Sequence, residues 1–158
     1  DSSVEVLTSD FAGRMESVDT VAAASPCIYN HNLETVPALY PEVRPGADYR
    51  RSLRVLARVR DTHPTLPAKS GLMLGLGESQ EQVIEVMRDL RDVGVTMLTL
   101  GQYLRPSPDH LPVAKFVEPG IFRSLAREAK RLGFAHVASA PFVRSSYHAE
   151  MMVAGADA

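Results

Sequence analysis

The sequence predicts an α/β fold built on parallel strands. Short β-prone segments alternate with longer segments whose apolar residues recur at helical spacing. Residues 95–100 are almost continuously apolar, as expected for a strand buried on both faces of a sheet. Repeated strand–helix–strand units imply parallel strands joined by right-handed crossovers, either in an open doubly wound sheet or in a barrel. A complete (β/α)₈ barrel needs about 250 residues, so this chain would form only an arc of one.

The first part of the chain contains two predicted strands and two predicted helices. Residues 4–7 are a short β-prone run, and residues 14–24 carry apolar side chains at helical spacing. Residues 27–30 are predicted to be the second strand. A stretch with three prolines, residues 37–45, is expected to interrupt regular structure. Residues 49–63 place an apolar stripe among arginines, which indicates an amphipathic helix.

The middle of the chain has the clearest helix signal. Residues 68–74 are predicted to be a third strand, and a helix is expected at residues 79–93. Ser79 is a suitable N-cap, Gln82 stands at the capping-box position, and Gly94 suits the position after the helix end.

The last part contains one more helix and one more strand. A polar loop with prolines, residues 102–112, follows the apolar strand. Pro119 suits the first turn of a helix through residue 132, and Gly133 is its stop. Residues 134–138 are predicted to be the fifth strand. The tail, residues 139–158, shows no sustained period.

Composition excludes several classes of function. The formal net charge is −2 and the pI is about 6.2, which gives no general attraction to nucleic acid or to an anionic membrane. We find neither an apolar run of about 20 residues nor a signal peptide, so we expect a cytoplasmic protein. The single cysteine, Cys27, excludes an internal disulfide and any site made of several thiolates from this chain alone.

The segment GLMLGLGES, residues 71–79, combines a strand end, a glycine turn and a helix start. Glycines allow the backbone to approach a bound group, and a helix start offers free N–H donors. The spacing of Gly71, Gly75 and Gly77 differs from the dinucleotide-binding G-x-G-x-x-G pattern. A tight strand-to-helix turn without a ligand is an equally good interpretation.

A polar run, YNHNLET, follows the second predicted strand, at the edge where a barrel binds its ligand. Four of its side chains can converge on a ligand: Asn30, His31, Asn32 and Glu34. A lone histidine at such a place is more often structural, and the spacing suggests no metal site. The nearby Lys69 can equally be interpreted as a solvated strand start.

Two further segments follow predicted strands. In LGQYLRPS, Gln102, Tyr103 and Arg105 can offer hydrogen bonds and a stacking face to a nucleoside, although a rigid surface loop is the alternative. In PFVRSSYHAE, residues 141–150, composition alone predicts a turn and a short helix capped by Ser145 or Ser146.

Taken together, six segments resemble the lipoyl synthase family of the radical S-adenosylmethionine superfamily. They are YNHNLET, VRPGADY, KSGLMLGLGE, MRDLRDVGVTMLTLGQYLRPS, HLPV and PFVRSSYHA. Gly71, Met73, Gly75 and Glu78 also resemble the superfamily element G-x-I-x-G-x-x-E, with Met73 in place of isoleucine. The resemblance covers residues 4–150 and concerns the C-terminal part of the family's chain. It implies an arc of a partial (β/α)₆ TIM-like barrel at residues 1–138 and a separate tail at residues 139–158.

The resemblance implies a sulfurtransferase of lipoate biosynthesis. Enzymes of this family use two [4Fe–4S] clusters and S-adenosylmethionine, and they insert sulfur at C6 and C8 of a protein-bound octanoyl-lysine. One cluster supplies the electron that generates a radical from S-adenosylmethionine, and the other cluster is the sulfur source. The implied partners are an octanoylated lipoyl-carrier domain or glycine cleavage H protein and an electron donor such as ferredoxin or flavodoxin.

The resemblance also implies site residues. Ser146, with Ser145 as the alternative, would be a ligand of the auxiliary cluster, and Arg144 would support it. Cofactor contacts are implied for Asn30, Asn32, Gly71, Gly75, Glu78, Tyr103 and Leu104. Substrate contacts are implied for His31 and Glu34. An oxygen ligand binds iron less durably than a thiolate, which suits a cluster that is dismantled during the reaction.

The chain departs from the family because both cysteine triads are absent from its 158 residues. Iron–sulfur clusters are held chiefly by several thiolates, so we expect this chain alone to assemble neither cluster and to be inactive. Two alternatives stay open. The chain can be a cluster-free binding module for an octanoylated carrier protein or S-adenosylmethionine, or it can belong to a barrel enzyme of the biotin synthase type.

Overall fold

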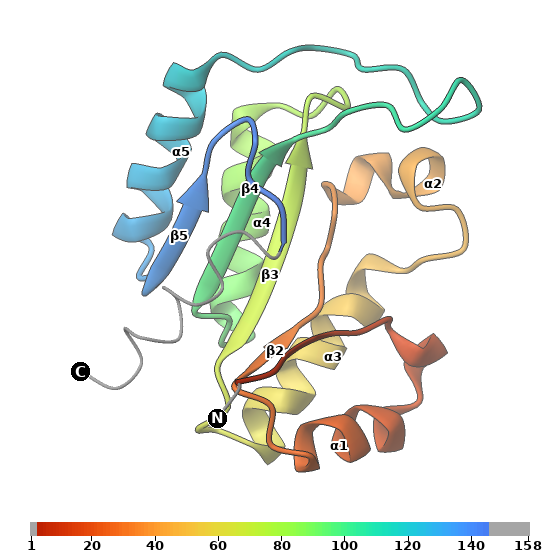
Figure 1. Ribbon diagram of the computed structural model, residues 1–158, viewed down its shortest axis with the longest axis vertical. Helices are drawn as coiled ribbons and strands as arrows, with labels where there is room; N and C mark the ends of the chain where they lie inside the picture. Colours follow the sequence, from red (N-terminus) through yellow and green to blue (C-terminus); the bar gives the residue numbers. More distant parts are fainter. Residues whose placement is uncertain (1–2, 146–158) are drawn as a thin grey trace.

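The computed structural model describes residues 3–145, and its centre is one sheet of five parallel strands. The strands are β1 (Glu5–Leu7), β2 (Ile28–Asn30), β3 (Ala68–Leu74), β4 (Met97–Gln102) and β5 (His136–Ser139). Their order in the sheet is their order in the chain, β1-β2-β3-β4-β5, so every strand lies beside its predecessor (Figure 1). The sheet is not closed within the described residues, since β1 and β5 form its two edges.

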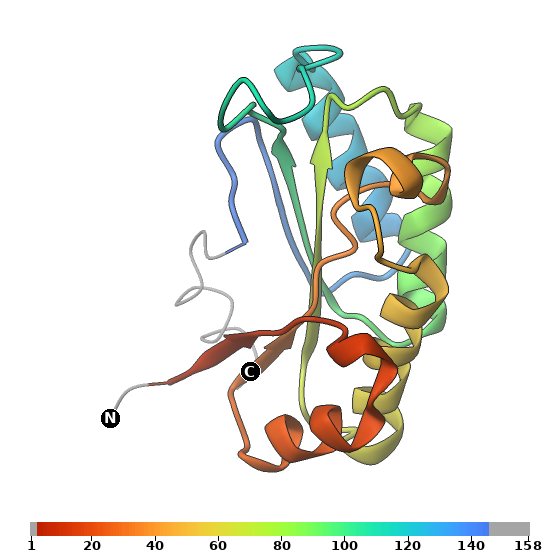
Figure 2. The same cartoon turned by 90° about the vertical axis from the view of Figure 1, so that its right-hand side faces the viewer.

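The helices lie on one side of this sheet, whereas the segment that follows β5 runs over the other side (Figure 2). The α-helices are α1 (Met15–Ala23), α2 (Tyr40–Val43), α3 (Tyr49–Thr62), α4 (Gln80–Asp92) and α5 (Pro119–Arg131), with two 3₁₀ turns, η1 (Phe11–Gly13) and η2 (Pro37–Leu39). A doubly wound sheet would carry helices on both faces. Helices on one face and sequential strand order therefore confirm the predicted arc of a TIM-like barrel.

The hydrophobic core fills the space between the sheet and the helices. Leu72, Leu98 and Leu100 point from the central strands toward Met87 of α4 and Phe122 of α5, and all five are buried. A second cluster joins α1 and α3 to Tyr29 of β2. Because side chains alternate across a strand, the residues between these apolar ones point to the opposite, helix-free face. That face is the inner face of the arc.

The predicted helix caps and stop residues are present in the structure. The Ser79 side chain accepts from the Gln82 amide at 3.2 Å and the Gln82 side chain accepts from the Ser79 amide at 2.9 Å, which confirms the capping box. Gly94 and Gly133 follow their helices with φ values of 87° and 92°, as left-handed stop positions. Pro119 stands in the first turn of α5.

Three segments differ from expectation. β5 was expected from residue 134 and begins at His136, because the Phe134 amide closes the turn after α5 by donating to the Ala129 carbonyl. Residues 37–45 were predicted to lack regular structure, but they form η2 and α2. Pro37 and Pro41 stand in first turns, where a missing N–H removes no helical hydrogen bond. β4 begins and ends two residues later than expected, because the Val95 amide closes the turn after α4 by donating to the Leu90 carbonyl.

Within residues 3–145 no helix has both the length and the apolar character needed to cross a membrane.

Candidate functional site

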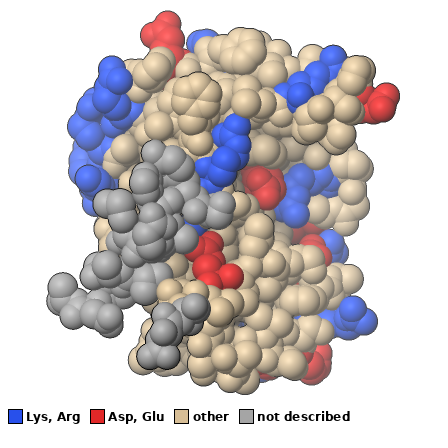
Figure 3. All heavy atoms as spheres, viewed as in Figure 1, with Lys and Arg blue, Asp and Glu red and all other residues tan. Residues whose placement is uncertain are grey.

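A cleft of about 270 Å³ opens on the inner face at the carboxyl ends of the strands. In parallel α/β folds, ligands bind at this edge. The cleft is lined by Leu7, Asn32, Glu34, Gly71, Leu72, Met73, Thr99, Gly101, Gln102, Leu104, Val143, Arg144 and Ser145. Figure 3 shows the corresponding face: most of its surface is uncharged, and Lys and Arg gather at the margin where α5 lies.

The floor of the cleft is formed by Gly71 of β3 between Asn32 and Thr99. Gly71 and Thr99 are paired in register on neighbouring strands. A Cβ atom built on Gly71 would lie 2.5 Å from Thr99 Oγ1 and 3.0 Å from Asn32 Oδ1. Any side chain at position 71 would therefore displace these two polar groups, so the glycine keeps the floor open.

Asn32 offers an unused acceptor at this floor. The residue is only 9% exposed, and its Oδ1 atom has no hydrogen-bond partner in the described part of the chain. A buried polar atom without a partner is costly, and a ligand that donates a hydrogen bond would remove that cost. Asn32 Oδ1 is therefore an unsatisfied acceptor of a residue that lines the cleft.

Glu34 lies beside Asn32 in the cleft, with a left-handed backbone at φ 67°. Burial raises the pKa of the Glu34 carboxyl, while a hydrogen bond from Asn32 and the charge of Arg44 oppose that rise. Arg44 is held in place because its guanidinium donates to the Asn32 carbonyl at 3.2 Å and stacks over the Tyr40 ring, 5.5 Å from the centroid. Asn32 and Glu34 thus place two hydrogen-bonding side chains next to each other in the cleft.

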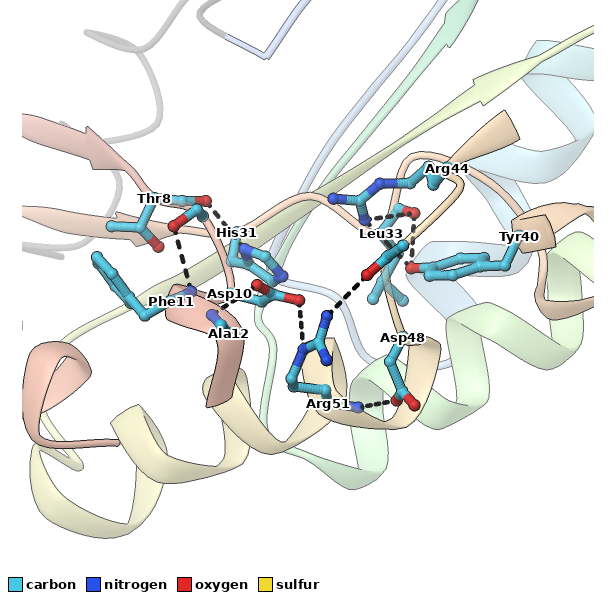
Figure 4. A network of polar contacts seen from close by, with 12 residues as sticks. Thr8, Asp10, Phe11, Ala12, His31, Leu33, Tyr40, Arg44, Asp48 and Arg51 are labelled. Carbon is cyan, nitrogen blue, oxygen red and sulfur yellow. Dashed lines mark hydrogen bonds and ion pairs between the residues drawn. The ribbon is translucent and has the colours of Figure 1, made fainter. Parts of the chain in front are cut away.

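The other two polar residues of the NHN run lie outside the cleft lining. Asn30 points to the inner face below the cleft, where its amide donates to Glu5 Oε1 at 2.9 Å. His31 points to the other side of the sheet, toward Asp10 and Arg51 (Figure 4). Its Nδ1 lies 2.9 Å from the Thr8 carbonyl oxygen, and burial lowers the pKa of the ring while that carbonyl opposes the effect.

Three predicted cofactor residues lie at or near a second cleft beyond the strand ends. Gly75 and Glu78 line it, and the Glu78 carboxylate accepts from the amides of Gly75 at 2.6 Å and Leu76 at 2.9 Å. Tyr103 is 7% exposed, and its hydroxyl donates to the Leu111 carbonyl at 2.9 Å. These contacts organise the loops around the glycine turn, so any role with a ligand remains a prediction.

Two exposed apolar side chains and one basic side chain line the first cleft. Leu7 and Leu104 line it while remaining 58% and 46% exposed. Arg144 and Ser145 lie on the segment that follows β5. Ser146, the predicted cluster ligand, lies outside the described residues.

Sequence reasoning missed Thr99, Gly101 and Leu7 as parts of the cleft. Their signal is the alternation within strands, because every second residue of β1 and β4 faces the inner side. Of the two interpretations of Lys69 that the sequence leaves open, a solvated strand start is excluded, because the exposed fraction of Lys69 is 0%. A parallel strand covered on both faces buries even its first residues.

The cleft residues fit S-adenosylmethionine better than they fit an iron–sulfur cluster. An unpartnered Asn32 acceptor, a floor opened by Gly71 and apolar side chains at the rim suit a nucleoside with hydroxyl groups. A cluster needs several thiolates, and the only cysteine, Cys27, borders a different pocket beside His63. Residues 3–145 contain no group of three or more His, Cys, Asp or Glu side chains that could hold a metal ion.

Several known proteins that are similar to this chain are lipoyl synthases. A lipoyl synthase of Methylococcus capsulatus is 62% identical over 153 residues, which is 96% of this chain and 48% of the relative. Lipoyl synthases of Nitrosococcus oceani and Escherichia fergusonii are 60% and 56% identical over the same share of this chain, covering 47% and 48% of those relatives. The chain thus spans about half the length of the curated relatives it matches. No family model matches it.

Proposed function

By sequence this chain belongs with the lipoyl synthases, and from that premise we propose that it is the C-terminal part of an enzyme that inserts sulfur into a protein-bound octanoyl-lysine. The proposal assigns residues 1–138 to half of the partial barrel and residues 139–158 to a tail that carries the RSSYHA segment. The observation that carries it is the cleft at the strand ends, where Gly71 opens the floor and Asn32 Oδ1 has no partner within residues 3–145.

In this proposal the cleft binds S-adenosylmethionine. Asn32 accepts a hydroxyl hydrogen of the cofactor, and Glu34 lies beside it in the cleft as a further hydrogen-bonding group. Met73 and Leu104 provide apolar contact for the base. Arg144 offers a positive charge at the rim. The bound cofactor would supply the radical chemistry that removes hydrogen from the octanoyl chain.

The proposal makes Ser146 an oxygen ligand of the auxiliary cluster, with Ser145 as the alternative. Cysteine ligands for both clusters would come from residues outside this chain, because Cys27 is its only cysteine. In this proposal the 158-residue chain completes the barrel around the cofactor and provides one weak oxygen ligand to the auxiliary cluster. Alone, it is expected to be inactive.

The substrate in this proposal is the octanoylated lysine of a lipoyl-carrier domain or glycine cleavage H protein. The exposed Leu7 and Leu104 at the rim suit contact with an acyl chain. A ferredoxin or flavodoxin would supply electrons.

A cluster-free binding module is the second candidate function. It is favoured by one observation: the only cysteine of this chain, Cys27, does not line the cleft, so a ligand bound there needs no iron–sulfur cluster from this chain. In that case the 158-residue chain binds S-adenosylmethionine or an octanoylated carrier without iron.

The test uses the intact parent protein, purified without oxygen. We expect iron and sulfide for two clusters, and lipoyl product from an octanoyl-lysine peptide with S-adenosylmethionine and a reductant, detected by mass spectrometry. Ser146→Ala should reduce product by about a hundredfold or more, as expected when a metal ligand or its support is lost, while Ser145→Ala is the matched control. A single cluster, together with undiminished product from Ser146→Ala, would refute the proposal. Iron-free calorimetry of the 158-residue chain with S-adenosylmethionine tests the second candidate.

A further inference from the structure

The segment that follows β2 carries one more residue than the strand beside it. Asn30 pairs in register with Lys69 of β3. Glu34 bridges to Leu72, so four steps along this segment match three steps along β3. An extra residue of this kind is a β-bulge, which bends the strand and re-aims side chains, often next to functional sites. Here the bulged segment is the one that brings Asn32 and Glu34 to the cleft.

Glu34 lies at the centre of a strained turn. Its φ is 67°, in the left-handed region, and the Thr35 amide donates across it to the Leu33 carbonyl at 2.8 Å. A positive φ beneath a hydrogen bond between residues i and i+2 is typical of the rare, strained form of the γ-turn. Residues other than glycine keep such a conformation only where the surrounding structure enforces it. Contacts around Glu34 therefore have to offset the strain.

Two side chains hold the backbone of this turn (Figure 4). The Arg44 guanidinium donates to the Asn32 carbonyl at 3.2 Å and to the Leu33 carbonyl at 3.4 Å. The Tyr40 hydroxyl donates to the same Leu33 carbonyl at 2.9 Å and accepts from Arg44 at 3.3 Å. We call this pair of side chains the Arg44–Tyr40 clamp. It binds the carbonyl that closes the turn and the carbonyl directly before it.

The clamp is attached to the core and to two helices. Tyr40 is 5% exposed, and its ring meets the Tyr49 ring of α3 edge-on with centroids 5.4 Å apart. The Tyr49 hydroxyl donates to Asp89 of α4 at 2.7 Å. The Arg44 guanidinium lies over the Tyr40 ring, 5.5 Å from its centroid. The turn is therefore held against helices that do not depend on the bulged segment for their own structure.

We propose that Arg44 is a positioning residue of the cleft: it holds the strained turn and so presents the side chains of Asn32 and Glu34 to a bound ligand. Arg44 is not among the described residues that line the cleft, so it acts through the turn and not by touching the ligand. The inference rests on the proposed function, in which the cleft binds S-adenosylmethionine. It adds that affinity for the nucleoside part depends on a guanidinium behind the cleft wall.

Hydrogen exchange in the 158-residue chain tests the hold on the turn. The Met73 amide donates to the Glu34 carbonyl at 2.8 Å and reports on the turn. Arg44→Met keeps an unbranched side chain but removes the donors, and it should speed exchange of the Met73 amide by about tenfold or more. The Val95 amide donates to the Leu90 carbonyl at 3.0 Å near the opposite end of the sheet, and its exchange should not change.

A glycine variant separates strain from ordinary loss of contacts. Glycine adopts the left-handed conformation freely, so Glu34→Gly removes the strain. When Arg44→Met is added to Glu34→Gly, exchange of the Met73 amide should change far less than when it is added to wild type. Equal acceleration in both backgrounds would overturn the inference, as would unchanged Met73 exchange in Arg44→Met. Equal acceleration of Met73 and Val95 would show general destabilisation and overturn it too.

The second test measures ligand binding by calorimetry with the intact parent protein, purified without oxygen. The probes are S-adenosylmethionine and 5′-deoxyadenosine, which share the nucleoside, although only the first has a methionyl carboxylate. Arg44→Met should weaken binding of both by a similar factor of about ten or more, because both ligands depend on the same side chains of the turn. Arg44→Lys returns a charged donor and should recover part of the affinity. Arg54→Met, a change at an exposed arginine of α3, is the matched control and should bind both as wild type does.

The two ligands distinguish positioning from direct contact. A loss confined to S-adenosylmethionine would mean that Arg44 binds the methionyl carboxylate itself, and the positioning role would be wrong. Wild-type affinity of Arg44→Met for both ligands would also refute it, while the proposed function would stand. If the wild-type parent binds neither ligand, the proposed function has failed, and hydrogen exchange still decides whether Arg44 holds the turn.

Discussion

The carboxylate of Glu78 accepts the amide hydrogen of Gly75 at 2.6 Å, and its second oxygen accepts that of Leu76 at 2.9 Å. The glycine turn between β3 and α4 is therefore held by a side chain three residues away. Gly75 itself has φ 100°, and a Cβ atom there would overlap Gln102 Nε2 and the Lys115 carbonyl. In this position Glu78 organises the turn, whether or not a ligand lies nearby.

Glu78→Ala is expected to destabilise the chain by about 2 kcal/mol, because two amides lose a charged acceptor. Glu78→Gln retains one acceptor oxygen and should cost about half as much. Urea unfolding measures both values. Glu85→Gln, an exposed change within α4, is the control and should stay within about 0.5 kcal/mol of wild type. Equal stability of Glu78→Ala and the control would contradict this account of the turn.

His31 is expected to make stability depend on pH. Burial lowers its pKa from 6.5, opposed by the Thr8 carbonyl, and its Nε2 has no partner among the described residues. The unfolded chain therefore binds a proton at a higher pH than the folded chain does. Stability should be constant above about pH 7 and fall as the pH drops below about 6.5.

The measurement is the urea midpoint of wild type and His31→Gln between about pH 7.5 and 5. The wild-type midpoint should fall more steeply below about pH 6.5 than that of the variant. The exposed His110 provides the control, since His110→Gln should keep the wild-type slope. Parallel curves for wild type and His31→Gln would show that His31 does not titrate abnormally.

Gly71→Ala tests the floor of the cleft. The added methyl would lie 2.5 Å from Thr99 Oγ1 and 3.0 Å from Asn32 Oδ1, so we expect a loss of about 1–3 kcal/mol in stability and loss of S-adenosylmethionine binding. Thr99→Ala in the same chain removes the closer clash and should restore most of the stability. Gly120→Ala, within helix α5, is the control and should not destabilise, because the added Cβ atom would meet only Arg123 Nη2 at 3.8 Å, an ordinary contact. Wild-type binding by Gly71→Ala would place the ligand elsewhere.

The sequence predicted those features that neighbouring residues determine. The capping box of Ser79 and Gln82 lies within one helical turn, and Gly94 and Gly133 act on the residues directly before them. The strands could be predicted because a short apolar run between two helices has few conformations open to it other than a strand. The helical turns within residues 37–45 could not, because a proline either ends a helix or occupies its first turn, and the sequence alone does not say which.

The site was harder to predict because it depends on strand register. Asn30, His31 and Asn32 were grouped as one polar cluster, although side chains alternate along extended backbone. Only Asn32 of the three lines the cleft, while His31 contacts the Thr8 carbonyl on the other side. The contact of Lys69 with Glu5 and Ser145 joins residues 64 and 76 positions apart, which no local pattern can indicate.

The exposed β1 edge of the sheet is expected to make the isolated chain self-associate. β1 has a strand on one side only in the described structure, and Val4 and Leu7 beside this edge are 57% and 58% exposed. Exposed strand edges with apolar side chains pair with other chains. We expect the isolated 158-residue chain to self-associate, and Leu7→Lys to shift it toward monomer, measured by light scattering after size exclusion. Phe142 is 81% exposed but lies away from this edge, so Phe142→Lys should leave association nearly unchanged. If the wild-type chain is monomeric, the β1 edge is protected from pairing. If Leu7→Lys and Phe142→Lys shift the association equally, general surface hydrophobicity and not the β1 edge drives it.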